Sequence, residues 1–109
     1  MKDDKIYIEH IHQSIDRIEA YLKGKDHLSF SNDFMLQDAV VRQLEIIGEV
    51  TKRISKDLRN KNPHVPWSDM AGMRDILIHD YIDVDIDIVW KTASESIIDL
   101  KTLLQDLTY

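Results

Sequence analysis

Cysteine is absent from this 109-residue chain, and glycine and proline are scarce, with three and two residues. Without cysteine the chain cannot form disulfides, thiolate zinc sites or a thiol nucleophile, and it fits a reducing compartment. The scarcity of glycine and proline favours helices. No apolar run approaches the roughly 20 residues of a membrane span, and the opening residues 1–5 include two acids and precede no signal-peptide core. We expect a cytoplasmic protein with no membrane partner.

Length and charge limit the organisation and the partners of the chain. Its 109 residues are enough for a single domain, residues 1–109, so a composite active site would need a second chain. The net charge of −6 disfavours polynucleotide partners in general, and no DNA binding is expected.

Residues 51–64 depart from this acidic balance, because five Lys or Arg and one Asp give them a local charge of +4. Lys52, Arg53 and Lys56 could form a basic ridge that holds a phosphate backbone. The alternative is a solvated helix end, where basic side chains favour the helix dipole. The remaining −10 disfavours indiscriminate binding of nucleic acid.

Apolar residues recur at steps of three and four in three long segments, which predicts three long helices. The first covers about residues 4–23, and the second runs to Leu58 with Ser31 or Asn32 as its cap. The last begins at Ile86, with Asp85 as its cap.

A shorter helix is predicted after the break at residues 62–66, with Ser68 as its cap. Residues 82–88 alternate with period 2, which alone indicates a strand, but a lone strand would have no partner. The pattern therefore predicts an all-α, antiparallel four-helix bundle with short loops.

The short helix carries the most chemically capable residues of the chain, Arg74, Asp75, His79 and Tyr81. One helical turn separates Asp75 from His79, so the carboxylate could orient the imidazole as a general base. Arg74 lies about 140° around an ideal helix from His79, so the pair would flank a groove or meet with the help of a second copy. This set points to phosphodiester chemistry without a metal. The alternative is structural: an arginine paired with a surface acid, a histidine at a helix end and a packed tyrosine.

Other polar patterns are weaker. The acids at positions 83, 85 and 87 resemble the start of a calcium loop, but Ile88 and Ser94 occupy the positions that need Gly and Glu. Glu9 and His12 have the spacing of a di-iron ligand pair, and the second pair that such a site needs is missing. We therefore expect no metal site. Glu49 precedes Arg53 by four residues, which favours a local ion pair, although both could also support the Arg74/His79 groove.

Three stretches together resemble the HepT-like family of HEPN proteins. They are Val41-Arg-Gln-Leu-Glu-Ile-Ile-Gly-Glu49, Val65-Pro-Trp-Ser-Asp-Met-Ala-Gly-Met-Arg-Asp-Ile-Leu-Ile-His-Asp-Tyr81 and Val89-Trp90. The specific core, Gly-Met-Arg-(Asn/Asp)-x-x-x-His-x-Tyr, is intact, with Asp75 after the arginine.

The resemblance implies a homodimeric helical bundle and a ribonuclease whose site forms where the two copies of the motif meet. Arg74, Asp75 and His79 would be catalytic, no cofactor would be needed, and the substrate would be transfer or messenger RNA cut by endo- or exonucleolytic cleavage. It further implies the toxin of a type VII-like toxin–antitoxin module, with a cognate minimal nucleotidyltransferase that transfers AMP to Tyr81. The alternative is a non-catalytic, substrate-binding partner of the transferase.

Overall fold

The computed structural model describes residues 2–79 and 85–109, and for residues 2 and 74–79 it describes the backbone alone. The described residues form helices and no strand. In chain order these are α1 (Lys2–Leu22), α2 (His27–Ser31), α3 (Phe34–Thr51), α4 (Lys56–Lys61), α5 (Trp67–His79), α6 (Ile86–Lys91), the π-helical turn η1 (Thr92–Ser96) and α7 (Ile97–Leu103). The predicted all-helical bundle is confirmed.

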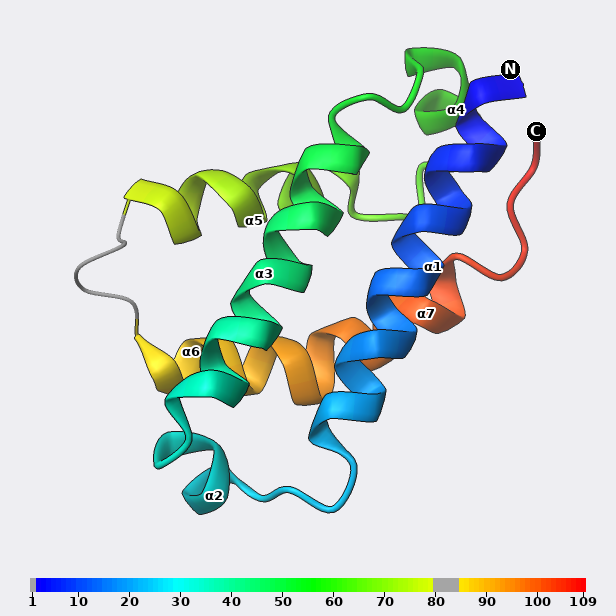
Figure 1. Ribbon diagram of the computed structural model, residues 1–109. Helices are drawn as coiled ribbons and strands as arrows, with labels where there is room; N and C mark the ends of the chain where they lie inside the picture. The colour runs from blue at the N-terminus through cyan, green and yellow to red at the C-terminus, as the bar shows by residue number, and fades with distance from the viewer. Residues whose placement is uncertain (1, 80–84) are drawn as a thin grey trace.

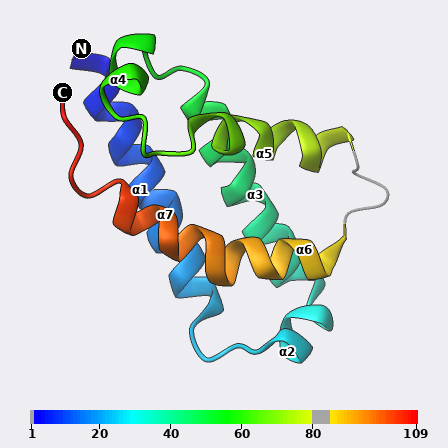
Figure 2. The same ribbon diagram turned by 180° about the vertical axis from the view of Figure 1, so that it is seen from behind.

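Two antiparallel helices, α1 and α3, form one layer of the molecule (Figure 1). α5 packs against α3 and runs away from α1, and the continuous arm α6–η1–α7 runs back in the opposite direction across both α3 and α1 (Figure 2). The two termini lie near each other beside α4. The loop that would join α5 to α6 falls on residues 80–84, outside the described residues.

The isoleucine stripe of α1 faces the core as its spacing predicts, and Ile11, Ile15 and Ile18 are fully buried. α3 and the α6–η1–α7 arm supply the opposing apolar side chains: Val40, Leu44 and Ile47 from α3, and Val89, Ala93, Ile97, Leu100 and Leu104 from the arm. At about 0.8 kcal/mol for each buried CH₂, this three-sided core is the main source of stability.

The bounds predicted for the second helix are wrong at both ends. Its N-cap is Asp33, whose side chain accepts a bond from the Leu36 N–H at 3.0 Å, and a separate short helix, α2, precedes it. At the other end α3 stops at Thr51, where tight bonds from the Arg53 and Ile54 N–H groups to carbonyls three residues back replace the α-helical pattern.

The chain then restarts at Ser55, which caps α4 by accepting a bond from the Leu58 N–H at 3.2 Å. The Asp4 carboxylate of α1 accepts bonds from the Ser55 N–H at 2.9 Å and from its hydroxyl at 2.6 Å. A contact across 51 positions of sequence therefore holds the cap of α4 in place, and the apolar period that continues to Leu58 does not indicate it.

Of the other two predicted helix caps, one is wrong and one is confirmed. α5 begins at Trp67, so Ser68 lies inside its first turn and is not the cap. Asp85 caps α6 as predicted, accepting bonds from Asp87 and Ile88 N–H groups. The helix after it is interrupted by the π turn η1, where the Ser94 hydroxyl donates to the Trp90 carbonyl at 2.6 Å.

Candidate functional site

Helix α5 carries Arg74, Asp75 and His79 on its carboxyl-terminal half. Its start is well anchored: Trp67 and Met70 are buried, and the Trp67 indole N–H donates to the Asn62 carbonyl at 3.0 Å. On this helix, five residues separate Arg74 from His79, a rise of about 7.5 Å and a rotation of about 140°. One helix therefore positions the backbone of all three residues.

The side chains of residues 74–79, and Tyr81 altogether, lie outside what the structure describes. The orientation of His79 by Asp75 and the modification of Tyr81 therefore stay predictions. Glu49 lies half-buried near the end of α3, the helix that packs most closely on α5. The supporting role of Glu49 requires that α3 and α5 lie side by side, and in the fold they do.

The three residues of the predicted basic ridge are exposed, but they do not lie on one helix. Lys52 is the C-cap of α3, Arg53 lies in the turn after it and Lys56 is the first residue of α4. The other two bases of this segment have structural roles: Arg59 donates to the Thr51 carbonyl at 2.7 Å, and Lys61 pairs with Asp57 at 3.1 Å.

The ridge and the end of α5 lie in different parts of the molecule. In both views α4 lies beside the N-terminal end of α1, whereas α5 runs away from α4 towards its carboxyl end (Figures 1 and 2). A nucleic acid held on the ridge of one chain would therefore have to extend across the molecule to reach His79 of the same chain.

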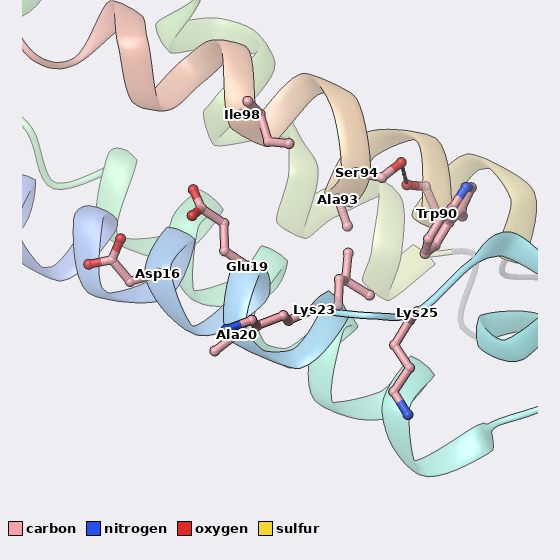
Figure 3. Close-up of a pocket in the computed structure, with 10 residues that line it drawn as sticks. Asp16, Glu19, Ala20, Lys23, Lys25, Trp90, Ala93, Ser94 and Ile98 are labelled. Carbon is pink, nitrogen blue, oxygen red and sulfur yellow. Dashed lines mark hydrogen bonds between the residues drawn. The ribbon is translucent and has the colours of Figure 1, made fainter.

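An open groove of about 690 Å³ lies between α1 and the α6–η1–α7 arm (Figure 3). Apolar side chains such as Ala93 and Ile98 line its middle, and Trp90 closes one end. At the other end Lys101 pairs with Glu19 at 3.1 Å and with Asp16 at 3.5 Å. The hydrogen bond and charge of Glu19 raise the pKa of Lys101, which favours its charged form.

Among the residues whose side chains the structure describes, those that line this groove come from α1, the turn after it and the α6–η1–α7 arm, and none comes from α5. Sequence reasoning did not find it, because its walls come from helices about 70 residues apart in the chain. Two residues of the last predicted helix could have indicated the groove: Trp90 and, one turn later, Ser94. The apolar period of that helix is uninterrupted, so it gave no other sign of the groove.

Two acids of the calcium-like pattern have structural roles. Asp85 is a helix cap, and Asp87 pairs with His27 at 2.6 Å. Within residues 2–73 and 85–109, no group of three or more His, Asp or Glu side chains could hold a metal ion. No described helix has the length and apolar character needed to cross a membrane.

Comparison with known proteins identifies relatives over nearly the whole chain. The family model described as "Ribonuclease HepT-like" matches residues 11–107. The chain is 42% identical over 106 residues to a "Probable ribonuclease HepT" of Thermococcus cleftensis, which covers 97% of this chain and 96% of that protein. It is 40% identical over 107 residues to a "Putative RNase" of Caldanaerobacter subterraneus subsp. tengcongensis, covering 98% and 96%.

A third relative is longer than this chain. The "Gamma-glutamylcyclotransferase and putative RNase" of Methanocaldococcus jannaschii is 46% identical over 100 residues, and the match covers 92% of this chain but 45% of that protein. The chain thus spans less than half the length of this relative. No solved structure gives a significant match. The matches to the family model and to full-length relatives show that the chain belongs to the HepT-like ribonuclease family.

Proposed function

We propose that this protein is a metal-independent ribonuclease that uses Arg74, Asp75 and His79, and that it is the toxin of a toxin–antitoxin module. The observation that carries the proposal is the family match over residues 11–107, together with the three residues on the single helix α5. RNA is the substrate, and two copies of the chain form the site.

The geometry of α5 supports a site shared between copies. Because Arg74 and His79 are about 140° apart on the helix, they do not share one face of it. When the carboxyl-terminal halves of two α5 helices meet, Arg74 of one copy lies opposite His79 of the other. Each chain then contributes half of each site.

The reaction is an attack by the ribose on its own phosphodiester. The His79 imidazole takes the proton of the 2′-hydroxyl, and the 2′-oxygen forms a bond to phosphorus as the bond to the 5′-oxygen breaks. The leaving 5′-oxygen takes a proton from water, and the product carries a 2′,3′-cyclic phosphate. Asp75 fixes the tautomer of His79, and the Arg74 guanidinium stabilises the charge that develops on the phosphoryl oxygens.

Neutralisation is proposed to occur at Tyr81. A partner nucleotidyltransferase would transfer AMP from ATP to the phenolic oxygen and release pyrophosphate. The phosphate of the attached AMP adds negative charge two residues beyond His79, where it competes with RNA for Arg74. Tyr81→Phe should then keep full cleavage activity and escape the transferase. Silencing of that variant by the transferase would contradict the role of Tyr81.

The direct test is cleavage of end-labelled transfer and messenger RNA in EDTA. Wild type is compared with His79→Ala and with a matched control, His10→Ala, whose imidazole is exposed on α1. We expect cleavage to 2′,3′-cyclic ends by wild type and control, and a loss of at least about 100-fold in His79→Ala. No cleavage by wild type, with an intact mass showing that Tyr81 is unmodified, would overturn the proposal in favour of a non-catalytic partner of the transferase.

A mixing experiment tests the shared site. Arg74→Ala and His79→Ala are each inactive alone, but a mixed dimer keeps one site with both side chains. When subunits of the two variants exchange at random in an equal mixture, half of the dimers are mixed. Each mixed dimer has one intact site of two, so the mixture should show about a quarter of the wild-type rate. No restoration after exchange, with mixed dimers shown by native mass spectrometry, would place Arg74 and His79 in the same chain.

A further inference from the structure

Large apolar side chains are exposed mainly in one region of the molecule. Of seven that are exposed among the described residues, four lie on α2, the first turn of α3 and the first turn of α6, and they are 61–84% exposed. They are Leu28, Phe34, Met35 and Ile88. The three elements contact one another, at the opposite end of the α1–α3 pair from α4 (Figure 1). We call these four residues the apolar corner.

The exposure of the apolar corner does not come from a loosely held segment. Asp26 and Ser29 form a capping box at the start of α2, with bonds of 2.8 and 2.9 Å. The Gln37 side chain donates to the carbonyls of Phe30 and Ser31 at 2.9 and 3.1 Å. Phe30 is fully buried, with its ring 5.4 Å from that of Trp90. A five-residue helix is thus fixed in place while its outer side chains face water, which is the preorganisation that a binding surface needs.

The segments that carry the apolar corner are acidic. Within three positions along the chain from its members there are five Asp and two Lys, a net charge of −3. The acids are Asp26, Asp33, Asp38, Asp85 and Asp87, and the bases are Lys25 and Lys91. Such a surface repels RNA, because phosphate contacts need basic side chains.

A second copy of the chain does not complement this surface. Two copies meeting corner to corner would bring two charges of −3 together. Contact between the corner of one copy and the basic residues 51–64 of another would be head-to-tail, and such contacts extend into open chains unless the rotation closes a ring.

We propose that the apolar corner is a docking surface for a different protein, one that presents apolar side chains bordered by Lys and Arg. A specific interface buries about 800 Å² on each partner, with an apolar centre and a polar rim. The four apolar side chains supply the centre, and the aspartates around them supply the rim. This inference is independent of the ribonuclease proposal, because it uses no residue of the α5 site.

Site-specific photo-crosslinking in the cells of origin tests the proposal. A benzophenone-bearing phenylalanine replaces Met35 in the full chain, and a matched chain carries it at Ile98, which is half-exposed on α7. The crosslinked peptides are sequenced by mass spectrometry. We expect position 35, and not position 98, to join a segment of another protein that is apolar and net positive.

A second measurement tests the charge. Asp38 is exposed on α3, so Asp38→Lys should leave the fold intact, which far-ultraviolet circular dichroism checks. We expect it to lower the crosslinking yield at position 35 by at least about fivefold. Crosslinks to a second copy of the chain or to RNA, equal crosslinking at positions 35 and 98, no crosslinks, or an Asp38→Lys yield equal to wild type would each overturn the proposal.

Discussion

The two ends of the α1–α3 pair differ in what they bury. Beside α4, polar side chains are inside: Asp4, Thr51 and Asn62 are at most 2% exposed, and each makes hydrogen bonds. Beside α2, large apolar side chains are outside. Burial of a polar group destabilises the fold unless the group is paired, and exposure of apolar surface is unfavourable unless something covers it. At the α4 end the buried polar groups are therefore paired within one chain, whereas at the α2 end the apolar side chains are left uncovered.

Two phenylalanines four residues apart sharpen this comparison. Phe30 is fully buried, whereas Phe34 is 78% exposed. Phe30→Ala should lower the free energy of unfolding by about 3–5 kcal/mol, because it removes a ring from the core and leaves a cavity. Phe34→Ala should change it by less than about 0.5 kcal/mol. Urea denaturation of both variants measures this, and a large effect of Phe34→Ala would mean that the corner is part of the core.

At the α4 end the largest effect is expected at Asn62. Its amide N–H groups donate to the carbonyls of Leu58 and Thr108 at 2.9 and 2.8 Å, and its side-chain oxygen accepts from the Thr108 N–H at 2.8 Å. Asn62→Ala should lower the free energy of unfolding by about 2–4 kcal/mol, because it removes three hydrogen bonds of a buried side chain, to the Leu58 carbonyl and to both backbone groups of Thr108. Asn60→Ala, at an exposed position of α4, is the control and should change it by less than about 0.5 kcal/mol. Equal effects of the two variants would contradict the role of Asn62 in holding the C-terminal segment.

Asp4 gives a smaller effect that depends on pH. Burial alone would raise the pKa of Asp4, but the bonds from the Ser55 hydroxyl and N–H outweigh it and lower the pKa below 3.8. The stabilisation is therefore present above pH 3.8 and is lost as the pH falls through the lower pKa of the folded state. Asp4→Asn should destabilise the fold by about 1–2 kcal/mol at pH 7.

The matched control for Asp4 is Asp3→Asn, because Asp3 lies in the same first turn of α1 and is exposed. It removes the same charge from the helix dipole without touching Ser55. Stability curves from pH 3 to 7 should show the difference between wild type and Asp4→Asn shrinking below about pH 4. A difference that is constant across this range would show that the carboxylate of Asp4 is not the source of the effect.

The same contrast explains what could be predicted from the sequence. The Ile11–Ile18 stripe and the cap at Asp85 depend on neighbours within one or two turns, so local periodicity and capping rules found them. The break after Thr51 depends on Asp4, 51 positions before Ser55, and α2 is too short to show a period.

For the candidate site, the spacing of Arg74, Asp75 and His79 and the resemblance to the family located the residues on one helix. Neither could locate the groove beside Trp90, because its two walls meet only in the folded chain. Nor could composition show that Arg59 bonds to the Thr51 carbonyl and Lys61 pairs with Asp57, since these contacts depend on where α3 ends and α4 begins.

His27 gives the smallest expected effect. Its imidazole contacts the Asp87 carboxylate at 2.6 Å and stacks on Trp90 at 5.9 Å, which ties α2 to α6. Both partners of the ion pair are more than half exposed, so His27→Ala should destabilise the fold by less than about 1 kcal/mol, with His10→Ala as the control. If instead its effect equals that of Phe30→Ala, the contacts of His27 with Asp87 and Trp90 hold α2 as strongly as the buried ring does. The small value would mean that the buried Phe30 ring and the Gln37 hydrogen bonds hold α2 in place, because water can replace the exposed pair of His27 and Asp87 but not these buried contacts.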